Sequence, residues 1–271
     1  MNINETKSQI IRANNNNDLT KIKHTIVSAL EKNKKDSNLK DLLKCVNDKI
    51  QPHLPKTLLK IQEFLKTSQI KCIQNKVNDG RTNSCLDENM IINTIMTNPD
   101  FVNIVKKPEK RFWYDLTVID PEFGVIPVNI KTTTLKTADN VGNMSLCLQS
   151  FTDVSMNFEQ SYNNGTASQL FLKKLKAKQL NTDFRKDYFF LVVNKDIPND
   201  IIVNSLLGIS TINPNVNNLP FQIRWKDNRE YSLSSVDDVE SKIKQFVDIM
   251  QKKAIKTWQE KFLYEFRDLK I

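Results

Sequence analysis

The chain has 271 residues, a hydrophobic fraction of 39% and a formal net charge of +9. The apolar fraction is enough for a packed core, and the basic excess favours a polyanionic partner, because Lys and Arg that neutralise phosphates release condensed counterions. A basic housekeeping protein from a Lys- and Asn-rich proteome is the alternative. The four Cys and two His stand far apart, which argues against a structural zinc site.

Residues 1–69 are predicted to form a helical region. Apolar side chains recur there at helical spacing, with a break marked by Pro52 and Pro55 before the last stretch. After a polar loop, Ser84 is predicted to cap a further helix. The Lys-rich faces of these helices are more typical of solvated surfaces than of DNA-binding ones.

Residues 111–134 read as two antiparallel strands joined by a tight turn. Because side chains alternate along a strand, Asn129 and Lys131 should project to one side of the second strand, with Asp115 of the first strand opposite them. The other face of the first strand is expected to carry Tyr114, Leu116 and Val118.

Further elements follow this strand pair. The pattern predicts a helix over 167–179, a buried strand over 187–193, another strand over 201–207, and one or two long helices over 234–270. We therefore expect an α/β fold in which a central mixed sheet is flanked by helices. Its parts are a helical N-terminal region at 1–69, an α/β core at 70–233 and a C-terminal helix at 234–271, within one continuous domain.

The strand pair offers the chemistry of phosphodiester cleavage. Asp115 can give a carboxylate, Asn129 an amide oxygen and Ile130 a backbone carbonyl, and oxygen donors of this kind suit Mg²⁺. Lys131 can orient the attacking water or steady the charge that develops on the phosphate. An ordinary hairpin in which Asp115 and Lys131 form a surface ion pair is the structural alternative.

Asp115, Asn129 and Lys131 form the pattern D-x(13)-N-x-K, within the segments YDLTVIDP and VNIKTTT. This pattern resembles the catalytic strands of the PD-(D/E)XK nuclease superfamily. The likeness is to its blunt-cutting, EcoRV-like type II restriction endonucleases. The resemblance implies a nuclease-like α/β core and Mg²⁺-dependent hydrolysis of double-stranded DNA at a short, palindromic sequence. Two positions depart from the pattern. Tyr114 stands where Pro often precedes the Asp, and Asn129 stands at the acidic position, where some active restriction enzymes carry Asn or Gln.

The resemblance also implies a role for Glu88. Superfamily members often place a Glu from a helix before the catalytic strands near the metal, so Glu88 is a candidate catalytic residue. A Glu in the first turn of a helix also suits the helix dipole. Both interpretations stay open.

Similar enzymes read DNA with the segment just beyond the catalytic Lys. The candidate contacts in that segment are Thr132, Thr133, Asn140 and Asn143. The Asn-rich loop at 213–218 is a second candidate, and a solvated connector is the alternative for both loops. Arg111 is a candidate for contact with the DNA phosphates, as are its basic neighbours Lys106, Lys107 and Lys110.

A palindromic site implies a homodimer, because the protein then shares the two-fold symmetry of the DNA. Helices at either terminus could supply the dimer contact, and the aromatic stripe of the last helix is the favoured candidate. Packing of that stripe inside the chain's own core is the alternative. The stripe consists of Trp258, Phe262 and Phe266. With no signal core at the N-terminus and no apolar run of membrane-spanning length, we expect a prokaryotic cytoplasmic protein. A DNA-binding protein that keeps a nuclease-like scaffold without catalysis is the alternative function, and Asn129 is the feature that favours it.

Overall fold

The computed structural model describes residues 2–13, 16–68, 70, 80–108, 112–141, 144–160, 163–215, 221–235 and 238–254. Its central sheet has five strands in the order β1-β2-β3-β5-β6, with β3 and β5 parallel and the other pairs antiparallel. Their bounds are β1 Val105–Lys106, β2 Leu116–Asp120, β3 Gly124–Thr133, β5 Phe189–Asn194 and β6 Ile201–Ser205. The predicted α/β class with a mixed sheet is confirmed.

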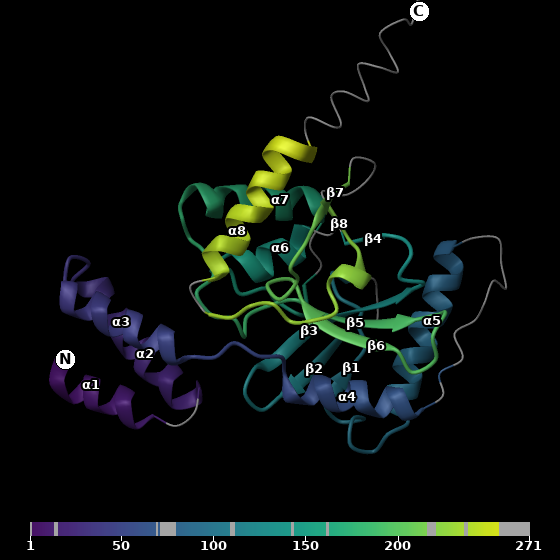
Figure 1. The fold of residues 1–271 in the computed structure, drawn as a ribbon, viewed down its shortest axis with the longest axis horizontal. Coiled ribbons are helices and arrows are strands. Elements are labelled where there is room, and N and C mark those ends of the chain that lie inside the picture. The colour runs from purple at the N-terminus through teal and green to yellow at the C-terminus, as the bar shows by residue number, and fades with distance from the viewer. Residues whose placement is uncertain are drawn as a thin grey trace, which may run out of the picture.

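Helices cover both faces of this sheet (Figure 1). On one face lie α4 (Lys56–Thr67) and α5 (Gly80–Met96), and on the other lie α6 (Met144–Phe151), α7 (Asn164–Lys176) and α8 (Asp238–Asp248). The alternation of side chains produces this division. In β5, Phe189, Leu191 and Val193 face the core of α4 and α5, whereas Phe190 and Val192 face the opposite core. The predicted buried central strand is thus confirmed.

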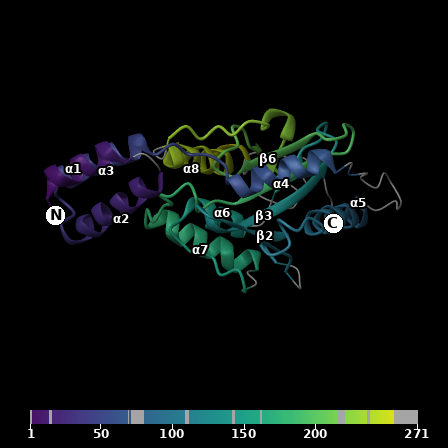
Figure 2. The same ribbon diagram turned by 90° about the horizontal axis from the view of Figure 1, so that it is seen from below.

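The first three helices form a separate group, seen at one end of the molecule in Figures 1 and 2. They are α1 (Ile3–Arg12), α2 (Asn16–Lys32) and α3 (Ser37–Lys49). Apolar side chains at helical spacing bury their shared interior, among them Ile26, Leu42 and Val46. Helix α4 packs instead against β2 and β6 of the central sheet. Of the four helices described before residue 70, three therefore pack on one another and the fourth packs on the sheet.

Two local predictions are wrong. Helix α5 begins at Gly80, so Ser84 lies inside the helix rather than capping it, and Glu88 lies beyond the first turn. The chain bends at residues 113–115 before β2 begins. Tyr114 therefore packs with Trp113 in the core under α6, not on the face that carries Leu116.

Helix α6 was not predicted. Its residues from Ser145 to Phe151 are all buried, and a helix buried on every side has no polar face to reveal its period. Toward the C-terminus, α8 continues into a π-helix at Ile249–Ala254. The predicted helix beyond residue 254, with its aromatic stripe, lies outside the described residues.

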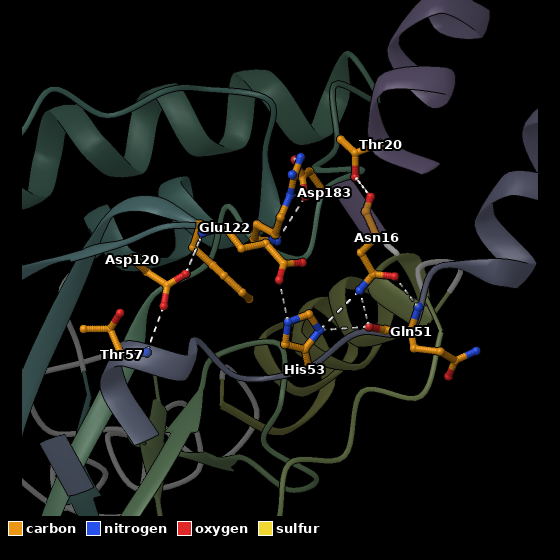
Figure 3. A network of polar contacts seen from close by, with 10 residues as sticks. Asn16, Thr20, Gln51, His53, Thr57, Asp120, Glu122 and Asp183 are labelled. Atoms are coloured by element: carbon orange, nitrogen blue, oxygen red, sulfur yellow. Dashed lines mark hydrogen bonds and ion pairs between the residues drawn. The ribbon is translucent and has the colours of Figure 1, made fainter. Parts of the chain in front are cut away.

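Asp120 connects the β2–β3 turn to the start of α4 (Figure 3). Its carboxylate accepts hydrogen bonds from the backbone N–H groups of Thr57 at 2.9 Å, Glu122 at 2.9 Å and Phe123 at 3.1 Å. Burial alone would raise the pKa of Asp120, but these hydrogen bonds bring that pKa below its ordinary value. The ionised carboxylate therefore stabilises the folded state.

We expect Asp120→Asn to lower the free energy of unfolding by about 1–3 kcal/mol at pH 7, because buried N–H donors lose a charged acceptor. The pKa of Asp120 is lower in the folded state than in the unfolded state. The stabilisation is therefore complete at a pH above the pKa of the unfolded state, and it is lost as the pH falls through the pKa of the folded state. Urea denaturation across pH 7 to 3 should show the variant and wild type converging at acid pH. The exposed Asp100→Asn is the control, and equal stability at pH 7 would contradict the prediction.

Candidate active site

The candidate site lies just before the first residue of β2, where β3 continues past its pairing with β2. The pairing of β2 with β3 reaches as far as Leu116 opposite Val128. One residue before β2, the N–H of Asp115 still donates to the carbonyl of Val128 at 3.0 Å. Beyond that point, among the described strands, β3 pairs with β5 only, as far as Thr133. The edge of β3 that faced β2 is therefore not paired with another described strand beside residues 129–133.

The carboxylate of Asp115 takes the place of a backbone partner at this edge. Its Oδ2 accepts a hydrogen bond from the N–H of Ile130 at 2.8 Å. Because the N–H and C=O of a strand residue point to the same edge, the carbonyl of Ile130 lies on the side of Asp115. Asn129 and Lys131, on either side of Ile130, project together from one face of β3. The structure thus brings together four of the predicted site residues.

The charges of Asp115 and Lys131 act on each other. Burial raises the pKa of Asp115, while the positive charge of Lys131 and the N–H of Ile130 offset part of that rise. Lys131 and the N–H of Ile130 thus offset only part of the cost of keeping this carboxylate ionised away from water. A second positive charge would stabilise its ionised form further.

The donors at this edge fit a magnesium ion. The Oδ1 atom of Asn129 is buried and has no hydrogen-bond partner, and it joins the Asp115 carboxylate and the Ile130 carbonyl as a hard oxygen donor. Within the described residues, no three His, Cys, Asp or Glu side chains come together as a metal site. Metal binding here would therefore use amide and backbone oxygens beside the single carboxylate.

Asp139 is a neighbour of the site that the sequence did not indicate. It lies in β4 (Asp139–Asn140), which pairs with β8 (Phe221–Ile223) in a second sheet completed by β7 (Asn213–Pro214). Burial raises the pKa of Asp139, whereas Lys131, a hydrogen bond from Thr133 and the charge of Lys195 lower it. The charge of Lys131 therefore acts on two carboxylates, those of Asp115 and Asp139. Only the long-range pairing of β4 with β8 could have revealed this.

Helix α5 reaches the end of β3 through Asp87. This residue is fully buried, and its Oδ2 lies 2.6 Å from the Nζ of Lys195. The backbone N–H of Lys195 in turn donates to the carbonyl of Thr133 at 2.8 Å. Glu88 is the next residue of the helix and is half-buried, so its catalytic role stays a prediction, while Asp87 supplies the acid that contacts this part of the sheet.

The two loops predicted to read DNA lie side by side. The amide of Asn215 donates to the Oδ1 of Asn140 at 2.6 Å, and both residues belong to the small β4-β8-β7 sheet or its edge. Asn140 is exposed and Thr132 is half-buried. Together with Asp139, this places one Asn-rich surface next to Lys131.

Thr133 does not fit its predicted contact with DNA. It is buried, with 3% of its surface exposed. Its Oγ1 accepts a hydrogen bond from the N–H of Leu135 at 3.3 Å and bonds to Asp139. Thr133 therefore bonds residues of the loop that follows β3. The predicted contacts Arg111 and Asn143, and the basic neighbour Lys110, lie outside the described residues.

No protein-family model and no curated protein sequence matches this chain. The likeness to the nuclease superfamily therefore depends on the residues of β2 and β3 alone. In the described part of the chain, no helix combines the length and the apolar composition needed to cross a bilayer.

Proposed function

We propose that this protein is a Mg²⁺-dependent endonuclease of the PD-(D/E)XK superfamily that cuts double-stranded DNA at a short, palindromic site, as a type II restriction enzyme of the prokaryotic cytoplasm does. The observation that carries the proposal is the convergence of Asp115, Asn129, Ile130 and Lys131 at the point where β2 leaves β3. A surface hairpin would leave Asp115 and Lys131 in solvent. Here Asp115 is half-buried and its carboxylate accepts from the Ile130 N–H of β3.

Each residue has a task in the proposed reaction. Asp115, Asn129 and the Ile130 carbonyl would hold Mg²⁺, which when bound neutralises charge on the scissile phosphate and lowers the pKa of water. The Lys131 ammonium donates hydrogen bonds to the attacking water or to the phosphate oxygens, where negative charge develops. The charges of Asp115 and Asp139 both act on that ammonium, so they favour its place beside the site before the substrate arrives.

The basic excess of the chain and the Asn-rich loops support DNA as the substrate. A net charge of +9 favours contact with phosphates. Asn side chains can bond base edges, and Asn140 and Asn215 meet on a surface beside Lys131. A two-fold homodimer would present this surface twice to a palindromic sequence.

Incubation of the purified protein with plasmid DNA and Mg²⁺ tests the proposal. We expect discrete fragments, and none when EDTA removes the metal. Sequencing of the fragment ends would give the recognition site and the cut position. Tight, salt-sensitive DNA binding without cleavage over a range of divalent metals would instead identify a DNA-binding protein without catalysis.

A further inference from the structure

Tyr188 lies directly behind the candidate metal site. It precedes β5 and is buried, with 1% of its surface exposed. Its ring packs against the rings of Trp113 and Phe190, with centroids 5.9 Å and 5.4 Å away. Its hydroxyl donates to the carbonyl of Trp113 at 2.8 Å. A phenol has one proton, so this bond leaves the oxygen of Tyr188 able only to accept.

The side chain of Asn129 provides the donor. Asn129 pairs with Phe190 in the sheet, two residues from Tyr188, which lies on the same face, and its amide hydrogen-bonds Tyr188. Because the Oδ1 of Asn129 has no hydrogen-bond partner and the oxygen of Tyr188 can only accept, the amide nitrogen is the donor. The Oδ1 atom is then directed away from Tyr188, where it is buried without a partner. Asp115 is close enough for its charge to act on Tyr188 as well. Because Asp115 accepts from the N–H of Ile130, the residue after Asn129, its carboxylate lies beside this stretch of β3.

A carboxylate could not take the place of this amide without conflict. It has no donor to offer, so one of its oxygens would face the lone pairs of Tyr188. Turning the hydroxyl toward it would leave the buried Trp113 carbonyl without its donor. It would also add a second buried negative charge beside Asp115.

We propose that Tyr188 is a positioning residue that turns the amide oxygen of Asn129 toward the metal, so that Asn129 is the residue this site is built to hold. The inference rests on the proposed function, since it concerns the same divalent cation. Tyr188 itself touches neither the cation nor the DNA. It acts through the Asn129 amide, which becomes a neutral oxygen ligand of fixed orientation.

Calcium binding to the whole chain, followed by calorimetry, tests this without any turnover. Tyr188→Phe keeps the ring but removes the oxygen, so the amide can present its nitrogen to the ion. We expect the Ca²⁺ affinity to fall roughly 10–100-fold, as when other residues that orient a ligand are removed. Tyr231→Phe, a second largely buried tyrosine that faces Asp187 rather than Asp115, is the matched control and should bind Ca²⁺ as wild type does.

Asn129→Asp distinguishes positioning from a general structural role. If Tyr188 acts through the amide, Tyr188→Phe should weaken Ca²⁺ binding in the wild-type background but not in the Asn129→Asp background, because a carboxylate presents oxygen in either orientation. An equal loss in both backgrounds would overturn the proposal. So would unchanged Ca²⁺ affinity in the single Tyr188→Phe variant.

A second measurement applies even if Tyr188→Phe does not fold. Metal-free Asn129→Asp keeps the tyrosine, and we expect its melting temperature to fall because the new carboxylate faces the oxygen of Tyr188. A melting temperature equal to that of wild type would overturn the inference. Wild-type protein that binds Ca²⁺ without cutting DNA with Mg²⁺ would refute the nuclease proposal and leave these comparisons valid. Wild-type protein that binds no divalent cation would refute both.

Discussion

Lys131→Ala is expected to abolish DNA cleavage and leave DNA affinity largely intact. The ammonium of Lys131 acts on charge that develops during the reaction, and loss of one such donor typically costs about 10²–10³-fold in rate. The side chain is only half-buried, so its removal should leave the fold in place. Single-turnover cleavage with Mg²⁺ and DNA binding with Ca²⁺ measure the two effects separately.

Lys244→Ala is the control for this prediction. Lys244 is exposed on α8 and pairs with Glu240 at 2.8 Å, so its loss should change the cleavage rate little. A Lys131→Ala protein that cuts at the wild-type rate would contradict the assigned chemistry. One that no longer melts cooperatively would show that the lysine serves the fold.

Asp115→Asn should also abolish cleavage, and in addition it should weaken cation binding. The substitution keeps an oxygen that can accept from the Ile130 N–H, so β3 keeps its edge contact, but it removes the one carboxylate among the three donors. We expect at least about 100-fold loss in both the cleavage rate and the Ca²⁺ affinity. This separates it from Lys131→Ala, which should leave Ca²⁺ binding nearly unchanged.

Asp153→Asn provides the matched control, because Asp153 pairs with Lys174 at 2.9 Å away from β3. Its cleavage rate and cation affinity should equal those of wild type. If Asp115→Asn binds Ca²⁺ as tightly as wild type, the metal lies elsewhere and the donor set proposed for β2 and β3 is wrong.

Local patterns were enough to predict the central part of this fold. The alternation in residues 124–133 and the apolar run before Asn194 depend on neighbours in the sequence, and both form strands where expected. The phase of β3 also places Asn129 and Lys131 on one face. Fold class and the core of the candidate site could therefore be predicted from the chain alone.

The remaining features depend on contacts between distant residues. Tyr188 was recognised as part of a buried strand, but its bond to the Trp113 carbonyl joins positions 75 residues apart. Asp139 reaches Lys131 only because β4 pairs with β8. Helix α6 carries no periodic signal because it is buried all round. No local pattern could have revealed these features.

Asp139 and Asn140 are consecutive residues of one two-residue strand. In the proposed enzyme, the charge of the first acts on Lys131 and the second lies on the Asn-rich surface offered to DNA, so one peptide unit joins the two residues. Contact of Asn140 with the correct bases would therefore also fix the position of Asp139, and through its charge that of Lys131. Exchanging that loop to change the recognition sequence would therefore also change the cleavage rate, because Asn140 and Asp139 belong to the same short strand.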